Sequence, residues 1–154
     1  MGERPEDYVI RLARAKAEAA WEGGDEIVLG ADTTVVLGEQ VLEKPLDAER
    51  ARAMLRSLSG QTHVVLTGIC LRHTGGAICD VSKTRVRFVP LDDAEIDEYV
   101  ASGEPMDKAG AYAIQGLASK FVDSVDGCYF NVMGLPLALV YRHLRKLSGK
   151  DQLR

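Results

Sequence analysis

An aspartate, a threonine and two lysines are the residues of this chain whose types and spacing best suit chemistry on a phosphorylated ligand. Asp32 and Thr33 closely follow a hydrophobic stretch, residues 27–29, which predicts a buried strand. Ligands of α/β proteins gather where strands end and loops begin. A carboxylate such as that of Asp32 can bind a divalent metal there or deprotonate a water molecule. Lys44, after a short hairpin, and Lys16, on a preceding helix, would meet a phosphate as point charges.

Two further segments combine small residues with polar side chains. The glycines and alanines of residues 107–116 would let a ligand approach the backbone, and Gln115 offers a donor and an acceptor to the edge of a nucleobase. Residues 131–136 end in a glycine, a leucine and a proline, which is ordinary helix initiation and also suits an anion. Structural interpretations stay open for all of them, since Asp32 would also cap a turn and residues 107–116 would also form a plain connection.

Composition and missing motifs argue against several other classes of protein. The net charge of −4, from 23 acidic and 19 basic residues, argues against binding to nucleic acid polymers. The sequence has no P-loop, GxGxxG fingerprint, nucleophile elbow or CxxC pair, and its histidines are too scattered for a metal cluster. Three cysteines, an odd number, favour reduced thiols. No apolar run approaches the ~20 residues of a membrane span and no signal peptide is visible, so we expect a cytoplasmic protein without a membrane partner.

Hydrophobic periodicity predicts the elements that would position the candidate residues. Helices are expected over 5–21, 48–58, from Asp92 or Asp93 to about 100, and 135–147; extended segments are expected over 26–31, 33–37, 40–42, 63–72, 78–89 and 121–125. In the last helix, the residues expected to face the core are Ala138, Leu139, Leu144 and Leu147. Hairpins and helical connections both occur, so we predict a single α/β domain, residues 1–154, built on a mixed sheet flanked by helices.

In their order along the chain, these segments resemble the Maf family of nucleoside triphosphate pyrophosphatases. The similarity extends from about Tyr8 to Leu147. The matching stretches are Leu12-Ala13-Arg14-Ala15-Lys16-Ala17, Gly30-Ala31-Asp32-Thr33, Leu42-Glu43-Lys44-Pro45, Leu58-Ser59-Gly60 with His63, Asp107-Lys108-Ala109-Gly110-Ala111-Tyr112, Ile114-Gln115-Gly116 and Gly134-Leu135-Pro136-Leu137. The resemblance implies the curved sheet of the Maf and inosine triphosphate pyrophosphatase folds.

The resemblance also implies a reaction. Family members cleave a nucleoside triphosphate between the α- and β-phosphates, releasing a monophosphate and pyrophosphate, and are thought to remove modified or surplus nucleotides. Asp32 matches the acid that activates water, and is the expected ligand of an assisting Mg²⁺ or Mn²⁺ ion. Lys16 and Lys44 match phosphate-binding lysines, while Thr33 and Gln115 match positions that select the base. These matches resemble the branch acting on dTTP and UTP rather than 7-methyl-GTP, and the family likeness implies a homodimer.

One part of the family pattern is missing from this sequence. Family members begin with a strand that leads into a Ser-x-Ser-Pro-Arg-Arg loop, whose side chains grip the phosphates. This chain starts with Glu3-Arg4-Pro5, which corresponds to the family's sequence after that loop. We therefore expect an N-terminally truncated Maf-like domain. The alternative is a non-catalytic nucleotide-binding or regulatory protein linked to septum formation.

Overall fold

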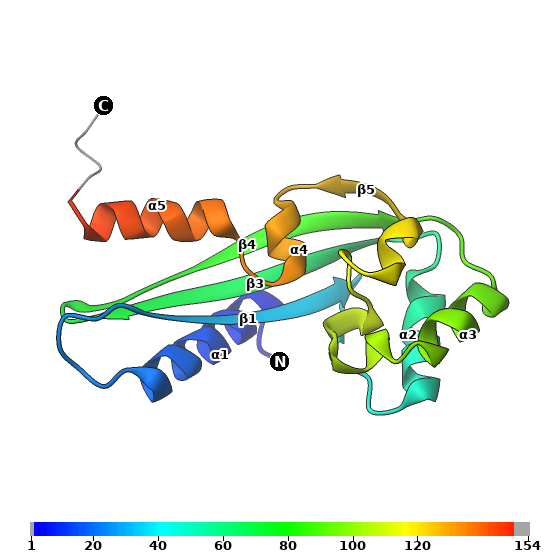
Figure 1. Ribbon diagram of the computed structural model, residues 1–154, viewed down its shortest axis with the longest axis horizontal. Coiled ribbons are helices and arrows are strands. Elements are labelled where there is room, and N and C mark those ends of the chain that lie inside the picture. The colour runs from blue at the N-terminus through cyan, green and yellow to red at the C-terminus, as the bar shows by residue number, and fades with distance from the viewer. Residues whose placement is uncertain (1, 150–154) are drawn as a thin grey trace.

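Five strands form one sheet in the computed structural model, which describes residues 2–149 (Figure 1). Their spatial order is β2-β1-β3-β4-β5. The strands are β1 (Val28–Leu37), β2 (Gln40–Leu42), β3 (Thr62–His73), β4 (Gly76–Phe88) and β5 (Val122–Asp126). The α-helices are α1 (Pro5–Ala20), α2 (Ala48–Leu58), α3 (Asp93–Ala101), α4 (Tyr129–Met133) and α5 (Leu137–Leu147). Short 3₁₀ turns are η1 (Glu104–Asp107), η2 (Ala109–Ala111) and η3 (Leu117–Phe121).

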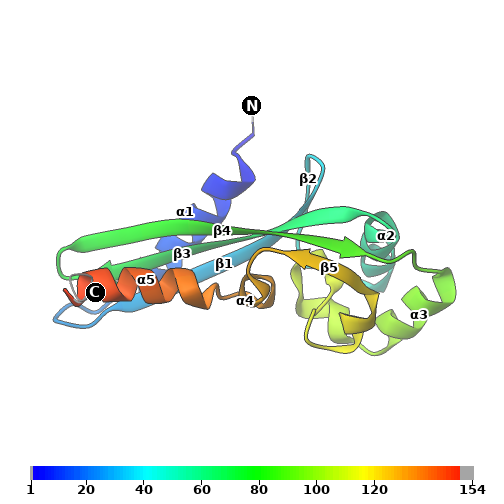
Figure 2. The same cartoon turned by 90° about the horizontal axis from the view of Figure 1, so that it is seen from above.

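The two faces of the sheet carry different helices. Helix α1 covers one face of the long strands, α4 and α5 lie on the other, and α2 and α3 gather at one end (Figures 1 and 2). Strand β1 pairs with β3 from Val28 to Val36, but with β2 only from Val35 to Leu37. Within the part of the chain that the structure describes, residues 28–34 of β1 therefore form a free edge of the sheet.

Helix α1 packs very close to the sheet because two glycines lie beneath it. A Cβ atom added to Gly30 would lie 2.2 Å from the carbonyl oxygen of Ala13, and one added to Gly68 would lie 2.4 Å from the carbonyl carbon of Val9. The facing alanine is itself fully buried. Glycine alone leaves room for backbones to approach this closely. This contact sets the position of α1, and therefore of Lys16, relative to β1.

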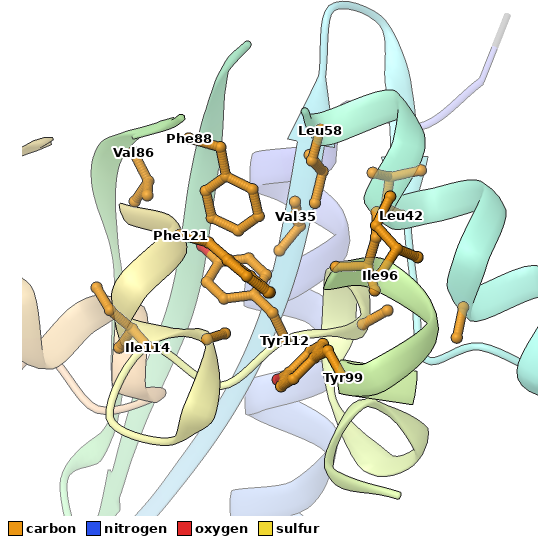
Figure 3. Close-up of a cluster of buried hydrophobic side chains, with 14 of the residues drawn as sticks. Val35, Leu42, Leu58, Val86, Phe88, Ile96, Tyr99, Tyr112, Ile114 and Phe121 are labelled. Carbon is orange, nitrogen blue, oxygen red and sulfur yellow. The ribbon is translucent and has the colours of Figure 1, made fainter. Parts of the chain in front are cut away.

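The main hydrophobic core lies between the sheet and the helices at its end (Figure 3). Phe88 of β4 is fully buried, and its ring meets those of Tyr112 and His63 edge-to-face with centroids 4.8 and 5.1 Å apart. Phe121 packs against the same ring at 6.2 Å. Edge-to-face pairs are favoured by the quadrupoles of aromatic rings. This packing holds the segment around Tyr112 against the sheet.

Most of the predicted elements are confirmed, as is an α/β fold with a helix-flanked sheet. Asp47 caps α2 by accepting a hydrogen bond from the main-chain N–H of Arg50, and Asp92 caps α3 in a capping box with Glu95. All strand pairings among residues 2–149 are antiparallel, however. The parallel component expected of a mixed sheet is not found in that range.

The expectation of a buried strand at residues 27–29 was wrong. Ile27 and Leu29 are 45% and 38% exposed. Ile27 lies just before β1 and Leu29 near its start, at the free edge, where no described strand pairs on the outer side. The apolar run therefore predicted the strand correctly but not its burial, because a continuous hydrophobic stretch does not distinguish an edge strand from a central one.

Helix α5 buries less of its surface than its sequence predicted. Val140 is its buried residue, whereas Leu144 is 37% exposed and Ala138 is also exposed. The other two expected core residues, Leu139 and Leu147, are half-buried. A helix that lies on the outside of a sheet has only a narrow stripe to bury, so part of the apolar face remains in solvent. Among residues 2–149, none of the helices has the length and apolar character needed to cross a bilayer.

Candidate active site

Asp32 and Thr33 are neighbours on the free edge of β1, and their side chains point to opposite faces of the sheet. Asp32 faces α1, where its Oδ1 lies 2.7 Å from Nζ of Lys16. Thr33 faces α4: its Oγ1 lies 2.8 Å from Oγ1 of Thr67, and a Cβ atom added to Gly134 would lie 3.6 Å from it. A ligand that contacts both side chains must therefore straddle the edge of the sheet.

The Lys16–Asp32 ion pair depends on the close packing of α1. The Asp32 side chain is 17% exposed and that of Lys16 is 58% exposed. Nζ of Lys16 also donates to the main-chain oxygen of Ala31, over 3.1 Å. Lys16 is the exposed partner, so solvent screens its side of the ion pair. Lys16 can therefore turn to an incoming phosphate without a large loss of stability, leaving the carboxylate of Asp32 free to accept a proton.

A cavity of about 270 Å³ runs along the edge of β1 beside both residues. A second hollow of about 220 Å³, on the α1 side, shares Asp32, Thr33, Lys44 and Ala109 with the first. The two together form a groove that passes from one face of the sheet to the other. The larger of the two, which reaches residues of both α1 and α4, combines cationic and apolar side chains, among them Lys16, Lys44, Lys108, Val35, Val65 and Val132. This mixture suits a ligand with an anionic part and a flat apolar part.

The chain crosses over β1 at η2 through left-handed backbone. Gly110 has φ +70, and a Cβ atom added there would lie 2.8 Å from a methyl carbon of Val35. The N–H of Gly110 donates to the main-chain oxygen of Glu43, over 3.3 Å. Glycine tolerates both the dihedral angle and the close approach. The crossing brings Lys108 to the cavity, which gives a physical reason for the glycine-rich sequence of this segment.

Tyr112 lines the cavity and is held from behind by the buried His63. The hydroxyl oxygen of Tyr112 lies 2.6 Å from Nε2 of His63. Burial lowers the pKa of His63 to about 4, so its imidazole is neutral near pH 7. Burial also raises the pKa of Tyr112, which keeps the phenol protonated. We therefore interpret this pair as a rigid part of the cavity wall rather than as a proton-transfer device.

The structure brings together all but one of the residues that the sequence predicted for the site. Lys16, Asp32, Thr33 and Lys44 line the cavity along β1. Gln115 is exposed and is not among the residues that line this cavity. Its role in selecting a base therefore stays a prediction.

Two buried polar residues behind Thr33 were not assigned to the site from the sequence. Thr67 is the one polar side chain in an otherwise apolar stretch of β3, and Asn131 lies in a segment interpreted as a helix start. Both are fully buried and belong to the hydrogen-bond network that ends at Thr33. A lone polar residue inside a hydrophobic strand was the available signal, but it does not reveal which side chain it will meet.

The acidic residues of the groove fit a metal ion only together with a ligand. Within residues 2–149, no group of three or more His, Cys, Asp or Glu side chains is arranged to hold a metal ion. Asp32 and Glu43 nevertheless line the same hollow on the α1 side. Magnesium is commonly held by one or two carboxylates together with substrate phosphates. The site therefore suits a divalent ion that shares its coordination with phosphate oxygens.

A larger hollow of about 770 Å³ adjoins this groove between α1, β2 and α2. It shares Tyr8, Glu43 and Lys44 with the α1-side hollow, but neither Asp32 nor Thr33 lines it. Volume alone would make it the first choice for a binding site. We assign the chemistry to the smaller groove because the carboxylate and the lysines meet there.

Comparison with known proteins places this chain in a family. The sequence profile described as "Maf-like protein" matches residues 1–147. A dTTP/UTP pyrophosphatase of Anaeromyxobacter dehalogenans strain 2CP-C is 56% identical over 149 residues, which cover 94% of this chain and 75% of that protein. The dTTP/UTP pyrophosphatase of Koribacter versatilis is 51% identical, covering 94% and 76%, and that of Escherichia coli O157:H7 is 49% identical, covering 99% and 78%. Because the family profile matches residues 1–147 of this 154-residue chain, the chain belongs to the Maf-like protein family.

Proposed function

We propose that this chain is a nucleoside triphosphate pyrophosphatase that hydrolyses dTTP and UTP to the monophosphate and pyrophosphate. The observation that carries the proposal is the Lys16–Asp32 pair at the free edge of β1, in one groove with Lys44 and Thr33. The names of relatives 49% to 56% identical over nearly the whole chain support the substrate class.

The cations of the groove would bind the polyphosphate on the α1 side of the edge. Lys16 and Lys44 offset its negative charge, which otherwise repels an attacking water. Asp32 accepts a proton from that water as the water oxygen bonds to the α-phosphorus. The bond from that phosphorus to the oxygen bridging to the β-phosphate breaks, and pyrophosphate leaves with the electron pair. Mg²⁺ or Mn²⁺, held by Asp32 and phosphate oxygens, would supply further positive charge to the leaving group.

The base would lie on the α4 side of the same edge, where Thr33 and the apolar wall are. Val65 and Val132 offer apolar contacts, and the hydroxyl of Thr33 offers a polar one. Gln115 is a second candidate for base selection, on the family resemblance alone. The proposed setting is the cytoplasm, with surplus or modified pyrimidine nucleotides as substrates.

We also propose that the enzyme is a homodimer. The support from this chain is an apolar stripe on α5 that the described residues leave uncovered: Leu137, Tyr141 and Leu144 are 47%, 60% and 37% exposed. Their spacing puts them on one side of the helix. Exposed apolar side chains in a group of this kind mark interaction surfaces more often than isolated ones do.

A non-catalytic nucleotide-binding role is the less favoured alternative. It would explain the cations and the apolar wall, but it gives no purpose to a carboxylate placed against a lysine beside the phosphate site. The enzyme names of the relatives also favour catalysis.

The deciding experiment measures pyrophosphate and orthophosphate released from dTTP, UTP, CTP, GTP and 7-methyl-GTP in Mg²⁺ or Mn²⁺. The purified 154-residue chain is assayed beside the E. coli relative as a positive control. We expect pyrophosphate, with dTTP and UTP turned over well above the other three. Release of orthophosphate, or equal turnover of all five, would contradict the proposal. Nucleotide binding without any release would favour the non-catalytic role.

A further inference from the structure

A chain of hydrogen bonds leads from Thr33 into the interior of the protein. Oγ1 of Thr33 lies 2.8 Å from Oγ1 of Thr67, on the neighbouring strand β3. Oγ1 of Thr67 in turn lies 3.1 Å from the main-chain oxygen of Asn131, in α4. Thr67 and Asn131 are both fully buried, so water does not compete for these bonds.

Counting protons shows which group donates in each of these hydrogen bonds. A main-chain carbonyl oxygen only accepts, and a threonine hydroxyl has a single proton to donate. Thr67 must give its proton to Asn131, because otherwise two oxygen atoms would face each other at 3.1 Å in a dry place without a hydrogen between them. Thr67 can then only accept from Thr33. The proton of Thr33 is therefore committed to Thr67, and the hydroxyl oxygen of Thr33 presents lone pairs, rather than a proton, to the groove.

The carbonyl that sets this direction is held firmly. Nδ2 of Asn131 donates to the main-chain oxygen of Val65, over 3.1 Å, and to Oγ1 of Thr84, over 2.9 Å. Thr84 passes its own proton to the main-chain oxygen of Cys128, over 3.0 Å. These bonds tie α4 to β3 and β4 on both sides of Asn131. The main-chain oxygen of Asn131 is thereby kept beside Thr67.

We infer that Thr67 and Asn131 are positioning residues that make Thr33 a hydrogen-bond acceptor, and so select pyrimidines that carry a proton on N3. Uracil and thymine have an N3–H donor, whereas N3 of cytosine carries a lone pair. An acceptor fixed at Thr33 attracts the first and repels the second. This inference rests on the proposed function and explains how that same groove would prefer dTTP and UTP over CTP.

The first test removes the group that accepts the proton of Thr33. Thr67→Val keeps the shape of the side chain but removes the acceptor for the Thr33 proton, which is then free to turn into the groove. We expect the ratio of kcat/KM for UTP to that for CTP to fall at least about tenfold, mainly through better use of CTP. Thr67→Ser restores the hydroxyl and should restore the ratio. An unchanged ratio in a folded Thr67→Val protein would overturn the inference.

A matched control separates the effect of the hydrogen-bond direction at Thr33 from a general loss of protein stability. Thr84→Val removes one bond that holds Asn131 but leaves the Thr33–Thr67–Asn131 chain in place. It should lower the melting temperature while keeping the UTP to CTP ratio. A loss of selectivity in Thr84→Val equal to that in Thr67→Val would mean that loosening of α4, rather than proton direction, is responsible, and would also overturn the inference.

A second measurement needs no variant. The triphosphate of 3-methyluridine lacks the N3–H, so the unaltered chain should use it at least about tenfold less well than UTP. Equal use would overturn the inference. If no triphosphate is hydrolysed, the proposed function fails, but the inference about Thr33 can still be tested by binding. The dissociation constants of UTP, CTP and the 3-methyl compound, measured by calorimetry with each variant, then test the same order of preference.

Discussion

At the scale of single residues, the site depends on two neighbours with opposite tasks. Asp32 and Thr33 are adjacent in the chain, yet the alternation of a strand sends Asp32 to the α1 face, the proposed phosphate side, and Thr33 to the α4 face, the proposed base side. In this proposal, one step along β1 is enough to separate the residue that activates water from the residue that selects the base. A substitution at one of these positions should therefore affect turnover or selectivity, but not both.

Replacing Asp32 by asparagine tests the chemical half of this division. The amide keeps the size of the side chain but accepts no proton, so kcat for UTP should fall by about 10²- to 10⁴-fold with little change in KM. Asp107→Asn is the matched control, because it makes the same change at an exposed carboxylate of the same cavity. Steady-state kinetics of both variants checks this. Equal losses in the two would remove Asp32 from its assigned role.

His63 makes stability depend on pH. Burial lowers its pKa from 6.5 to about 4 in the folded state, so between these values the unfolded chain binds a proton that the folded chain does not. With respect to His63, the folded state has its full stability above pH 6.5 and loses stability as the pH falls toward 4. The free energy of unfolding should drop by about 3 kcal/mol over this interval from His63 alone.

Urea unfolding at several pH values, repeated with His63→Gln, separates the pH dependence that arises from His63 from that of the carboxylates. The variant loses the titrating group and keeps an acceptor for the hydroxyl of Tyr112. Its free energy of unfolding should therefore vary less with pH than that of the unaltered chain. Parallel curves for the two proteins would show that the buried imidazole is not the source.

At the scale of elements, the position of Lys16 is set by how closely α1 approaches the sheet. Gly68→Ala would put a methyl group 2.4 Å from the backbone of α1, which must then move away. We expect a loss of at least about 2 kcal/mol in the free energy of unfolding. Gly75→Ala is the control, since its new methyl group meets only the flexible side chain of His73. Thermal or urea unfolding compares the two, and similar losses would contradict this account of α1.

The sequence predicted the elements well because their signals are local. Helix caps such as Asp47 and Asp92, and the turn between β3 and β4, are encoded within a few residues. The convergence of Lys16, Asp32, Thr33 and Lys44 was expected from a family resemblance, and the cavity brings them together.

The contacts between side chains of different strands could not be predicted from the sequence, because they depend on the register of strand pairing. The bond between Thr33 and Thr67 exists because β1 and β3 place those two residues opposite each other, 34 positions apart in the chain. The exposure of Ile27 likewise depends on which strand lies at the edge. Hydrophobic patterns determine which segments are extended, but they do not determine which side chains will face each other across strands.

At the scale of the whole molecule, α5 carries a stripe of partly exposed apolar side chains. Tyr141 is the most exposed residue of the α5 stripe, and the structure describes no element that covers it. If two copies of the chain meet there, Tyr141→Lys should weaken their association at least about tenfold, since it introduces a charge into a desolvated contact. Glu98→Lys, on an exposed position of α3, serves as the control.

Sedimentation equilibrium over a range of concentrations checks this expectation. A dimer in the unaltered chain and in Glu98→Lys, with a monomer in Tyr141→Lys, would support pairing through α5. A dimer that withstands the change at Tyr141 would move the interface elsewhere, and a monomeric unaltered chain would contradict the homodimer itself.

The contact between α1 and the sheet has a consequence for how genetic data on this protein should be interpreted. Gly68 lies directly opposite Asp32 in the pairing of β1 with β3. Any side chain at Gly68 would push α1 away and take Lys16 with it. A mutational scan scored by activity alone would therefore rank this glycine beside Asp32, the proposed general base, although glycine has no functional group to offer a nucleotide. Scoring the abundance of folded protein in parallel would tell the two positions apart.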